Sequence, residues 1–192
     1  MSERVRILRV EWQRQQPDLK RRKLWFLDET GVNLSLARSF GRAFGGQRAM
    51  GNVPKNYGSG VTVLGAMRDD GQLATLEVHG ATDELVMLAF IREILTPVLK
   101  KGDLVVMDNL TSHKTQQVQQ AFAELEVEVL YLPPYSPDLN PSEKMWSKVK
   151  ALLRSAEART FEQLIPAIAA ALARVTAQDA LGWFASCGYS FC

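Results

Sequence analysis

Leu104-Val-Val-Met107 is a run of four consecutive apolar residues, and Asp108 follows it directly. A short apolar run without alternation is typical of a central strand whose sheet is covered on both faces. The run Leu24-Trp-Phe-Leu-Asp28 has the same form and also ends on a carboxylate. We therefore expect two buried, neighbouring strands, each of which is closed by an aspartate.

The chain between these two strands contains a hairpin and a helix. Val61 to Arg68 and Leu73 to Val78 are predicted antiparallel strands, because Asp70-Gly71 between them is a strong turn signal. Apolar residues at helical spacing predict a helix between Thr82 and Lys100. Residues 31–60 hold seven glycines and no sustained period, which indicates a basic, glycine-rich excursion with at most short strands.

One more strand and several helices are predicted after Met107. They are a helix with an apolar stripe from Val118 to Leu125, a strand from Val127 to Leu132, a helix that Asn140 caps, a helix from Thr160 to Val175 with Thr160 and Gln163 as a capping box, and a helix from Ala177 to Ser186. This order predicts an α/β fold. Its five-stranded mixed sheet has three antiparallel strands, extended by two parallel strands and flanked by helices.

The composition is that of an ordinary globular protein, with 192 residues, 46% hydrophobic residues and a formal net charge of +2. Disorder and coiled coils are excluded. Residues 1–23 hold eight basic and three acidic side chains, so this segment carries +5 and the remainder −3. We interpret residues 1–23 as a basic linker or arm and residues 24–192 as one domain. A solvated helix or tail explains the same charge equally well.

No membrane or secretory segment is predicted. The longest apolar stretch, Leu164 to Ala173, contains Pro166 and is about half of the roughly 20 residues that a membrane helix needs. The N-terminus has no hydrophobic core of a signal peptide. The only cysteines, Cys187 and Cys192, lie at the end of the chain and form no disulfide framework. We expect a cytoplasmic protein.

Three carboxylates, Asp28, Asp108 and Glu143, are expected at one edge of the sheet. Glu143 lies in the first turn of the helix that follows the fifth strand, within reach of the two strand ends. Neighbouring carboxylates repel each other unless a cation or a proton lies between them. An oxygen-only set without a cysteine or histidine cluster suits Mg²⁺ or Mn²⁺ rather than zinc.

Each carboxylate also has a purely structural interpretation. Asp28 would simply end a strand, with Glu29 as the ligand in its place, and Asp108 would open an ordinary loop. Glu143 would complete a capping box with Asn140. We favour the metal site because three independent structural roles need not converge on one sheet edge.

His113 and Lys114 follow Asp108 at the predicted start of a helix. There they would contact a phosphate group or assist proton transfer, because a helix N-terminus favours anions. A solvated pair is an equally good interpretation.

The most specific pattern is Leu132-Pro-Pro-Tyr-Ser-Pro-Asp-Leu-Asn-Pro-Ser-Glu143. Together with Leu27-Asp-Glu-Thr30 and Met107-Asp-Asn-Leu-Thr-Ser-His113, it resembles the catalytic domain of mariner-type insertion-sequence transposases, which are Asp-Asp-Glu (DDE) superfamily endonucleases. The resemblance runs from about Leu24 to the region of Phe161. Between Asp108 and Glu143 lie 34 residues, a spacing that this family uses.

The resemblance implies a ribonuclease H-like fold in which Asp28, Asp108 and Glu143 form the catalytic triad. By the same resemblance the triad holds two Mg²⁺ ions, or Mn²⁺ as a substitute, when DNA is bound. The implied activity is cleavage of DNA at transposon ends, followed by transfer of the freed 3′-hydroxyl into target DNA. The implied partner is double-stranded DNA, on which the chain would act as a homodimer in the bacterial cytoplasm, at the nucleoid.

Phosphate affinity would come from basic residues around the acidic site. The candidate DNA contacts are His113, Lys114, Arg21, Arg22, Lys23, Arg48 and Lys55.

The sequence departs from the family in its N-terminal part. Full-length relatives carry a helix-turn-helix region that reads the terminal repeats, and no room for it exists before Leu24. A fragment, a separate recognition chain and a degenerate element are all compatible with this. The alternative functions are another ribonuclease H-like nuclease, or a catalytically idle, DNA-binding or dimerising transposase remnant.

Overall fold

The computed structural model describes residues 2–19, 22–38, 40–55 and 60–189. Its centre is a five-stranded sheet in the order β3-β2-β1-β4-β5. The strands are β1 (Leu24–Val32), β2 (Val61–Arg68), β3 (Leu73–His79), β4 (Leu104–Met107) and β5 (Glu128–Tyr131). β1, β2 and β3 are antiparallel, and β4 and β5 run parallel to β1. The predicted mixed sheet is confirmed.

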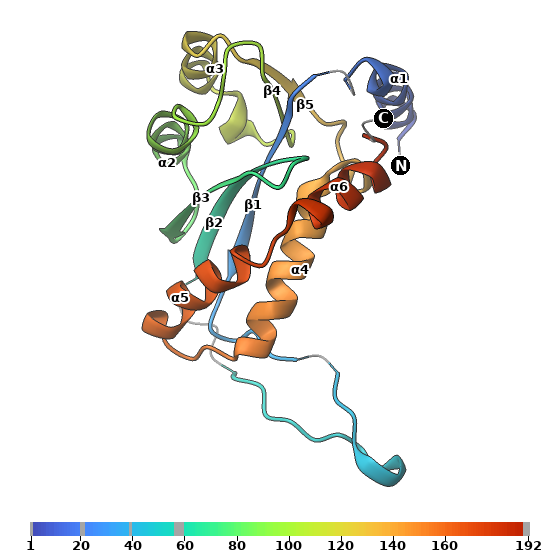
Figure 1. Cartoon of the computed structure of the whole chain (residues 1–192), viewed down its shortest axis with the longest axis vertical. Helices are drawn as coiled ribbons and strands as arrows, with labels where there is room; N and C mark the ends of the chain where they lie inside the picture. Colours follow the sequence, from blue (N-terminus) through green and yellow to red (C-terminus); the bar gives the residue numbers. More distant parts are fainter. Residues whose placement is uncertain (1, 20–21, 39, 56–59, 190–192) are drawn as a thin grey trace.

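Helices cover both faces of this sheet (Figure 1). One face carries α2 (Glu84–Ala89), a π-helical segment (Phe90–Leu95) and α3 (Gln116–Glu124). The other face carries α1 (Glu3–Leu19), α4 (Pro141–Ala156), α5 (Phe161–Leu172) and α6 (Ala177–Ser186). Short 3₁₀ turns lie at Phe44–Gly46, Thr111–Lys114 and Pro137–Leu139.

Side chains of β1 alternate between two separate hydrophobic cores. Trp25 and Leu27 pack with α2 and α3, whereas Phe26 packs with α4 and α6, where its ring lies edge-on to Phe184. Successive strand residues point to opposite faces, so a strand buried on both sides must be apolar throughout. By the same alternation, Asp28 emerges on the α4 face.

The sequence analysis expected Asp28 to close its strand, and this expectation is wrong. β1 continues to Val32 because its pairing with β2 runs from Trp25 and Arg68 to Val32 and Val61. On its other side the pairing with β4 ends at Leu27 and Met107. Asp28 and Asp108 therefore each follow the last residue pair of the two parallel strands, at the point where the sheet opens.

The predicted helix from Thr82 to Lys100 is shorter in the structure, and it changes from an α-helix to a π-helix at Phe90. Asp83 caps α2 by accepting the Val86 N–H, and the following π-helical segment ends at Leu95. Pro97 explains the early end, because proline has no N–H and clashes with the preceding helical turn.

The hairpin, the strand Leu104–Met107 and the helix Ala177–Ser186 form as predicted, with His79 added to β3. The capping box of α5 is only half formed. Thr160 accepts the Gln163 N–H, but the Gln163 side chain bonds to the Arg159 N–H instead of closing back on the cap.

Residues 3–19 form a helix that packs on the sheet domain instead of extending into solvent. Val5, Trp12 and Leu19 are its buried residues, and Trp12 and Leu19 belong to the same core as Phe26. These three positions recur every seven residues, which gives one narrow buried stripe, while the apolar side chains of Ile7 and Val10 are exposed. α1 thus shares its core with the domain that follows.

The glycine-rich excursion between β1 and β2 projects from the body of the molecule (Figure 1). Phe40, Phe44 and Met50 in it are almost fully exposed. No single helix in the described ranges is long and apolar enough to cross a membrane. α5 and α6 pass that test as a pair, bent by 75°, but their buried residues are part of the protein core.

Candidate functional site

Asp28, Asp108 and Glu143 line a single cleft at the sheet opening. The cleft has a volume of about 560 Å³. Its other lining residues come from the segment after β4 (Asn109, Leu110), from Leu132, and from the loop before α4 (Pro133, Pro134, Tyr135, Ser136, Pro137, Asn140). Three carboxylates from three separate parts of the chain thus face one space, as the sequence analysis predicted.

Asp28 is the most buried of the three, with only 8% of its surface exposed. One carboxylate oxygen accepts the Glu29 N–H at 2.8 Å, and the other accepts the Asn140 side-chain N–H at 2.9 Å. Burial raises the pKa of Asp28 to about 7, and the charges of Glu143 and Asp108 act in the same direction. The two hydrogen bonds lower that pKa but do not offset the burial.

Asp108 is more open, with 36% of its side chain exposed. One of its carboxylate oxygens accepts the Leu110 N–H, and the same oxygen lies 2.7 Å from Nδ1 of His113. The His113 ring is completely buried, and neither ring nitrogen makes a well-directed hydrogen bond to any described group. His113 therefore lies behind Asp108 and not on the molecular surface.

Glu143 lies in the first turn of α4 and is exposed to the cleft. Asn140 caps the helix by accepting the Ser142 N–H. Among the described bonds, the Glu143 carboxylate does not return to the Asn140 N–H, which donates to the Pro137 carbonyl instead. The alternative of a full capping box is thus not realised, and the Glu143 carboxylate is left for the cleft.

Asn140 has a second function that the sequence analysis did not predict. Its amide both caps α4 and holds Asp28, so the start of the helix and the central carboxylate are fixed to each other. Ser142 is buried, and its hydroxyl donates to the Phe26 carbonyl. The pairing of Asn140 with Asp28 joins residues 112 positions apart, and no local pattern reports such a contact.

The donor set fits a hard divalent cation, because all three groups offer carboxylate oxygen. Within the described part of the chain, no three Asp, Glu, His or Cys side chains lie close enough together to form a ready metal-binding group. Asp28 is buried and held by two hydrogen bonds, whereas Asp108 and Glu143 are more exposed on the cleft that they share with it. Burial is the main cause of the raised pKa of Asp28, and the charges of Glu143 and Asp108 add to it. A cation in the cleft would neutralise this added negative charge.

The predicted basic DNA contacts are not gathered at the cleft. Arg22 forms an ion pair with Glu128 at the opposite end of the parallel strands, and Lys23 is exposed beside it. Lys114 lies over the ring of Tyr131, 4.7 Å from its centre. The exposed Arg48 and Lys55 lie in the excursion, and Arg21 lies outside the described residues.

Known proteins share this architecture. The chain is 26% identical to the Tcb1 transposase of Caenorhabditis briggsae over 186 residues, which cover 89% of this chain and 67% of that protein. Its fold is similar to that of the Mos1 strand transfer complex, with a TM-score of 0.77, 19% identity and coverage of 98% of this chain and 59% of the Mos1 chain. The Mos1 catalytic domain with Raltegravir and Mg has a TM-score of 0.65, 14% identity and coverage of 97% and 90%.

The similarity to the Mos1 structures confirms the ribonuclease H-like fold that the resemblance implied. The chain spans about 59% of the length of the Mos1 chain in the strand transfer complex. A family model described as DDE superfamily endonuclease matches residues 23–165, which include all three carboxylates of the cleft. Because this match covers most of the chain, the protein belongs to the DDE superfamily endonucleases.

Proposed function

We propose that this chain is the catalytic domain of a mariner-type transposase, which cleaves DNA at transposon ends and joins the freed 3′-hydroxyl to target DNA. The observation that carries the proposal is the convergence of Asp28, Asp108 and Glu143 on one open cleft. The likeness to the Tcb1 transposase supports it. Mos1 complexes solved with transposon-end DNA, with Mg and with Mn have the same fold.

In this proposal Asp28, Asp108 and Glu143 together hold two Mg²⁺ or Mn²⁺ ions when DNA is bound. Such ions supply an activated attacking oxygen on one side of a phosphodiester and stabilise the leaving oxygen on the other. Asp28 provides the fixed point of the set, because Asn140 and the Glu29 N–H hold both of its oxygens. Burial of Asp28 excludes water from one side of the set, and the open side admits the DNA strand.

The two reactions balance without any further reagent. In cleavage, a water oxygen forms a bond to phosphorus while the bond from phosphorus to the 3′ oxygen breaks, which leaves a 3′-hydroxyl. In strand transfer, that 3′-hydroxyl oxygen bonds to a target phosphorus, and the bond from this phosphorus to its own 3′ oxygen breaks. The attacking hydroxyl loses one proton and the leaving 3′ oxygen gains one, so the numbers of atoms and bonds are unchanged. No covalent bond to the protein is needed in either step.

A homodimer on DNA is part of the proposal, as is a helix-turn-helix segment or chain that recognises the transposon ends. Candidate phosphate contacts are Arg22, Lys23, Arg48, Lys55 and Lys114. Because these residues are spread over the surface, they would meet DNA at several places and not at the cleft alone. His113, which is buried, is better placed to support Asp108 than to touch DNA.

The proposal is tested by nicking of supercoiled plasmid in Mn²⁺, with the wild type beside Asp108→Asn. The substitution keeps the shape of the side chain and removes one metal-binding charge, so we expect nicking by the wild type and at least a 100-fold loss in the variant. Glu93→Gln, at an exposed position on the other face of the sheet, is the matched control and should nick like the wild type. Equal nicking by Asp108→Asn would overturn the triad assignment.

The same assay addresses the idle-remnant alternative. Absence of nicking by the wild type, with plasmid binding retained, would favour a DNA-binding remnant or the need for a separate recognition chain.

A further inference from the structure

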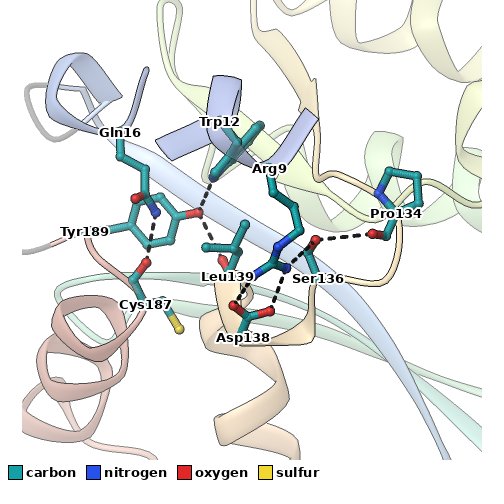
Figure 2. A network of polar contacts seen from close by, with 9 residues as sticks. All are labelled: Arg9, Trp12, Gln16, Pro134, Ser136, Asp138, Leu139, Cys187 and Tyr189. Atoms are coloured by element: carbon teal, nitrogen blue, oxygen red, sulfur yellow. Dashed lines mark hydrogen bonds and ion pairs between the residues drawn. The ribbon is translucent and has the colours of Figure 1, made fainter. Parts of the chain in front are cut away.

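The loop Pro133–Asn140, which we call the rim loop, lies between the cleft and the N-terminal helix. Its front contributes six residues to the lining of the cleft. Its back is bonded to α1 and to the C-terminal Tyr189 (Figure 2). α1 and the segment from Cys187 to Tyr189 thus meet behind one wall of the candidate active site.

Arg9 of α1 binds two residues of the rim loop at once. Its guanidinium donates to Ser136 Oγ at 2.8 Å and to the two Asp138 carboxylate oxygens at 2.9 and 2.6 Å. The Ser136 hydroxyl in turn donates to the Pro134 carbonyl at 3.2 Å. The Arg9 side chain is 18% exposed and the Asp138 side chain 59% exposed, so solvent screens the pair in part, and its forked geometry is what makes it specific.

Tyr189 holds the next residue of the loop. Its buried hydroxyl accepts the Trp12 indole N–H at 2.8 Å and donates to the Leu139 carbonyl at 3.0 Å. Gln16 adds a bond from α1 to the Cys187 carbonyl at 2.9 Å, which ties the C-terminal segment to the helix. As Figure 2 shows, α1 reaches the rim loop both directly and through Tyr189.

The rim loop needs such support because its own conformation is strained. Tyr135 has a φ of 55°, in the left-handed region that a bulky side chain rarely adopts, and its ring is mostly exposed. The loop ends at Asn140, which holds Asp28, and α4 with Glu143 begins one residue later. Movement of the loop would therefore displace Asp28, through Asn140, and Glu143, through the start of α4.

We propose that Arg9 and Tyr189 are positioning residues of the candidate active site: they hold the rim loop from behind and so keep Asn140 and Glu143 in place around Asp28. The effect on catalysis rests on the proposed nuclease function. The effect on the loop does not, because it concerns the protein alone.

The first experiment measures hydrogen exchange of the rim loop in the protein without DNA or metal. Arg9→Met keeps the aliphatic stem and removes the fork. We expect the Leu139 and Asn140 amides to exchange about 10-fold faster, as loss of one strong restraint predicts. Arg9→Lys restores the charge but cannot bridge both loop residues, so its exchange should fall in between.

Lys101→Met is the control for this measurement, because it removes an exposed ion pair with Glu126 at the opposite end of the sheet. Its rim loop should exchange as in the wild type. If Arg9→Met behaves like this control, the proposal is overturned. If Arg9→Met does not fold, Asp138→Asn breaks the same pair from the loop side and decides the question.

The second experiment compares plasmid nicking in Mn²⁺ with plasmid binding. We expect Arg9→Met to lower the nicking rate by about 10- to 100-fold with DNA affinity unchanged, because a misplaced site loses rate and not binding. A fall in DNA affinity with unchanged loop exchange would instead make Arg9 a DNA contact and refute the proposal. A loosened loop with full nicking would refute it too.

The two experiments separate the two proposals. If the wild type does not nick, nuclease activity of this chain alone is refuted, while the exchange result still decides whether Arg9 holds the loop.

Discussion

Gly65 of β2 provides a sharp test of how α4 is placed over the sheet. It pairs with Asp28 in the register of β1 and β2, and it lies beneath Trp146 of α4. A Cβ at position 65 would lie 2.7 Å from Cη2 and 2.9 Å from Cζ2 of the Trp146 ring. Atoms in ordinary contact are about 3.5–4.0 Å apart, so Gly65→Ala would force the ring to withdraw by about 1 Å.

The loss of stability expected for Gly65→Ala depends on how closely the Trp146 ring is packed. Trp146 is buried, and its neighbour Met145 already approaches the same Cβ position at 3.4 Å. Inserting one methyl group into such a core destabilises it by about 1–3 kcal/mol. Taking about 2 kcal/mol, and about 2–4 °C per kcal/mol for a domain of this size, Tm should fall by about 4–8 °C.

Thermal unfolding followed by circular dichroism measures this fall, and Gly31→Ala is its matched control. Gly31 lies in the adjacent strand with open space around its Cβ position, so alanine there should leave Tm unchanged or raise it slightly. Trp146→Phe removes the ring atoms nearest to position 65, so the double variant should lose less stability than the two single variants together. Equal Tm values for Gly65→Ala and Gly31→Ala would refute the close approach.

Three further predictions follow from the polar contacts. Tyr189→Phe leaves two buried partners of the hydroxyl unpaired and should lower the free energy of unfolding by about 1–3 kcal/mol, as measured by urea titration. Hydrogen bonds from Lys148 and then Thr176 lower the pKa of Asp179 to about 2, below its usual value of 3.8. The stability gained from this pair is therefore complete above about pH 4 and is lost as the pH falls toward 2. Asp179→Asn should destabilise the protein at pH 7 and not at pH 2, and a constant difference in urea midpoints would contradict this. Asn140→Ala removes a helix cap and should cost about 1–2 kcal/mol in the same titration; its nicking activity should fall as well, which a purely structural cap would not explain.

The elements that the sequence predicted well are those whose boundaries are set locally. The hairpin of β2 and β3 is fixed by Asp70-Gly71, and β4 is fixed by its apolar run between Gly102 and Asp108. The full length of β1 was missed, because its pairing partner β2 lies across the excursion. Local patterns report turns and buried runs, whereas strand length depends on a neighbour that is distant in sequence.

The residues around the candidate site show the same difference between local patterns and contacts that are distant in sequence. Asp28, Asp108 and Glu143 could be predicted as one cluster because two of them follow apolar runs, the third lies in the first turn of a helix, and the pattern around Glu143 is specific. The structure brings the three to one cleft. Arg9 was read only as part of a basic segment, because its partners Ser136 and Asp138 are more than 120 residues away. The net charge of residues 1–23 does not show which basic side chain contacts the rest of the protein. The tertiary structure shows that Arg9 binds Ser136 and Asp138.

The excursion leaves and rejoins the sheet at a single pair of residues, Val32 and Val61. Arg159 holds the start of the excursion by donating to the Leu34 and Leu36 carbonyls. Beyond these residues the excursion extends away from the body of the molecule (Figure 1). Because the free energy of closing a loop rises by only about 0.6 kcal/mol per doubling of its length, this segment is thermodynamically free to lengthen, shorten or change composition. The architecture thus offers an evolutionary module. New surfaces can be tried on the excursion while the cleft, whose residues lie outside this segment, keeps its geometry.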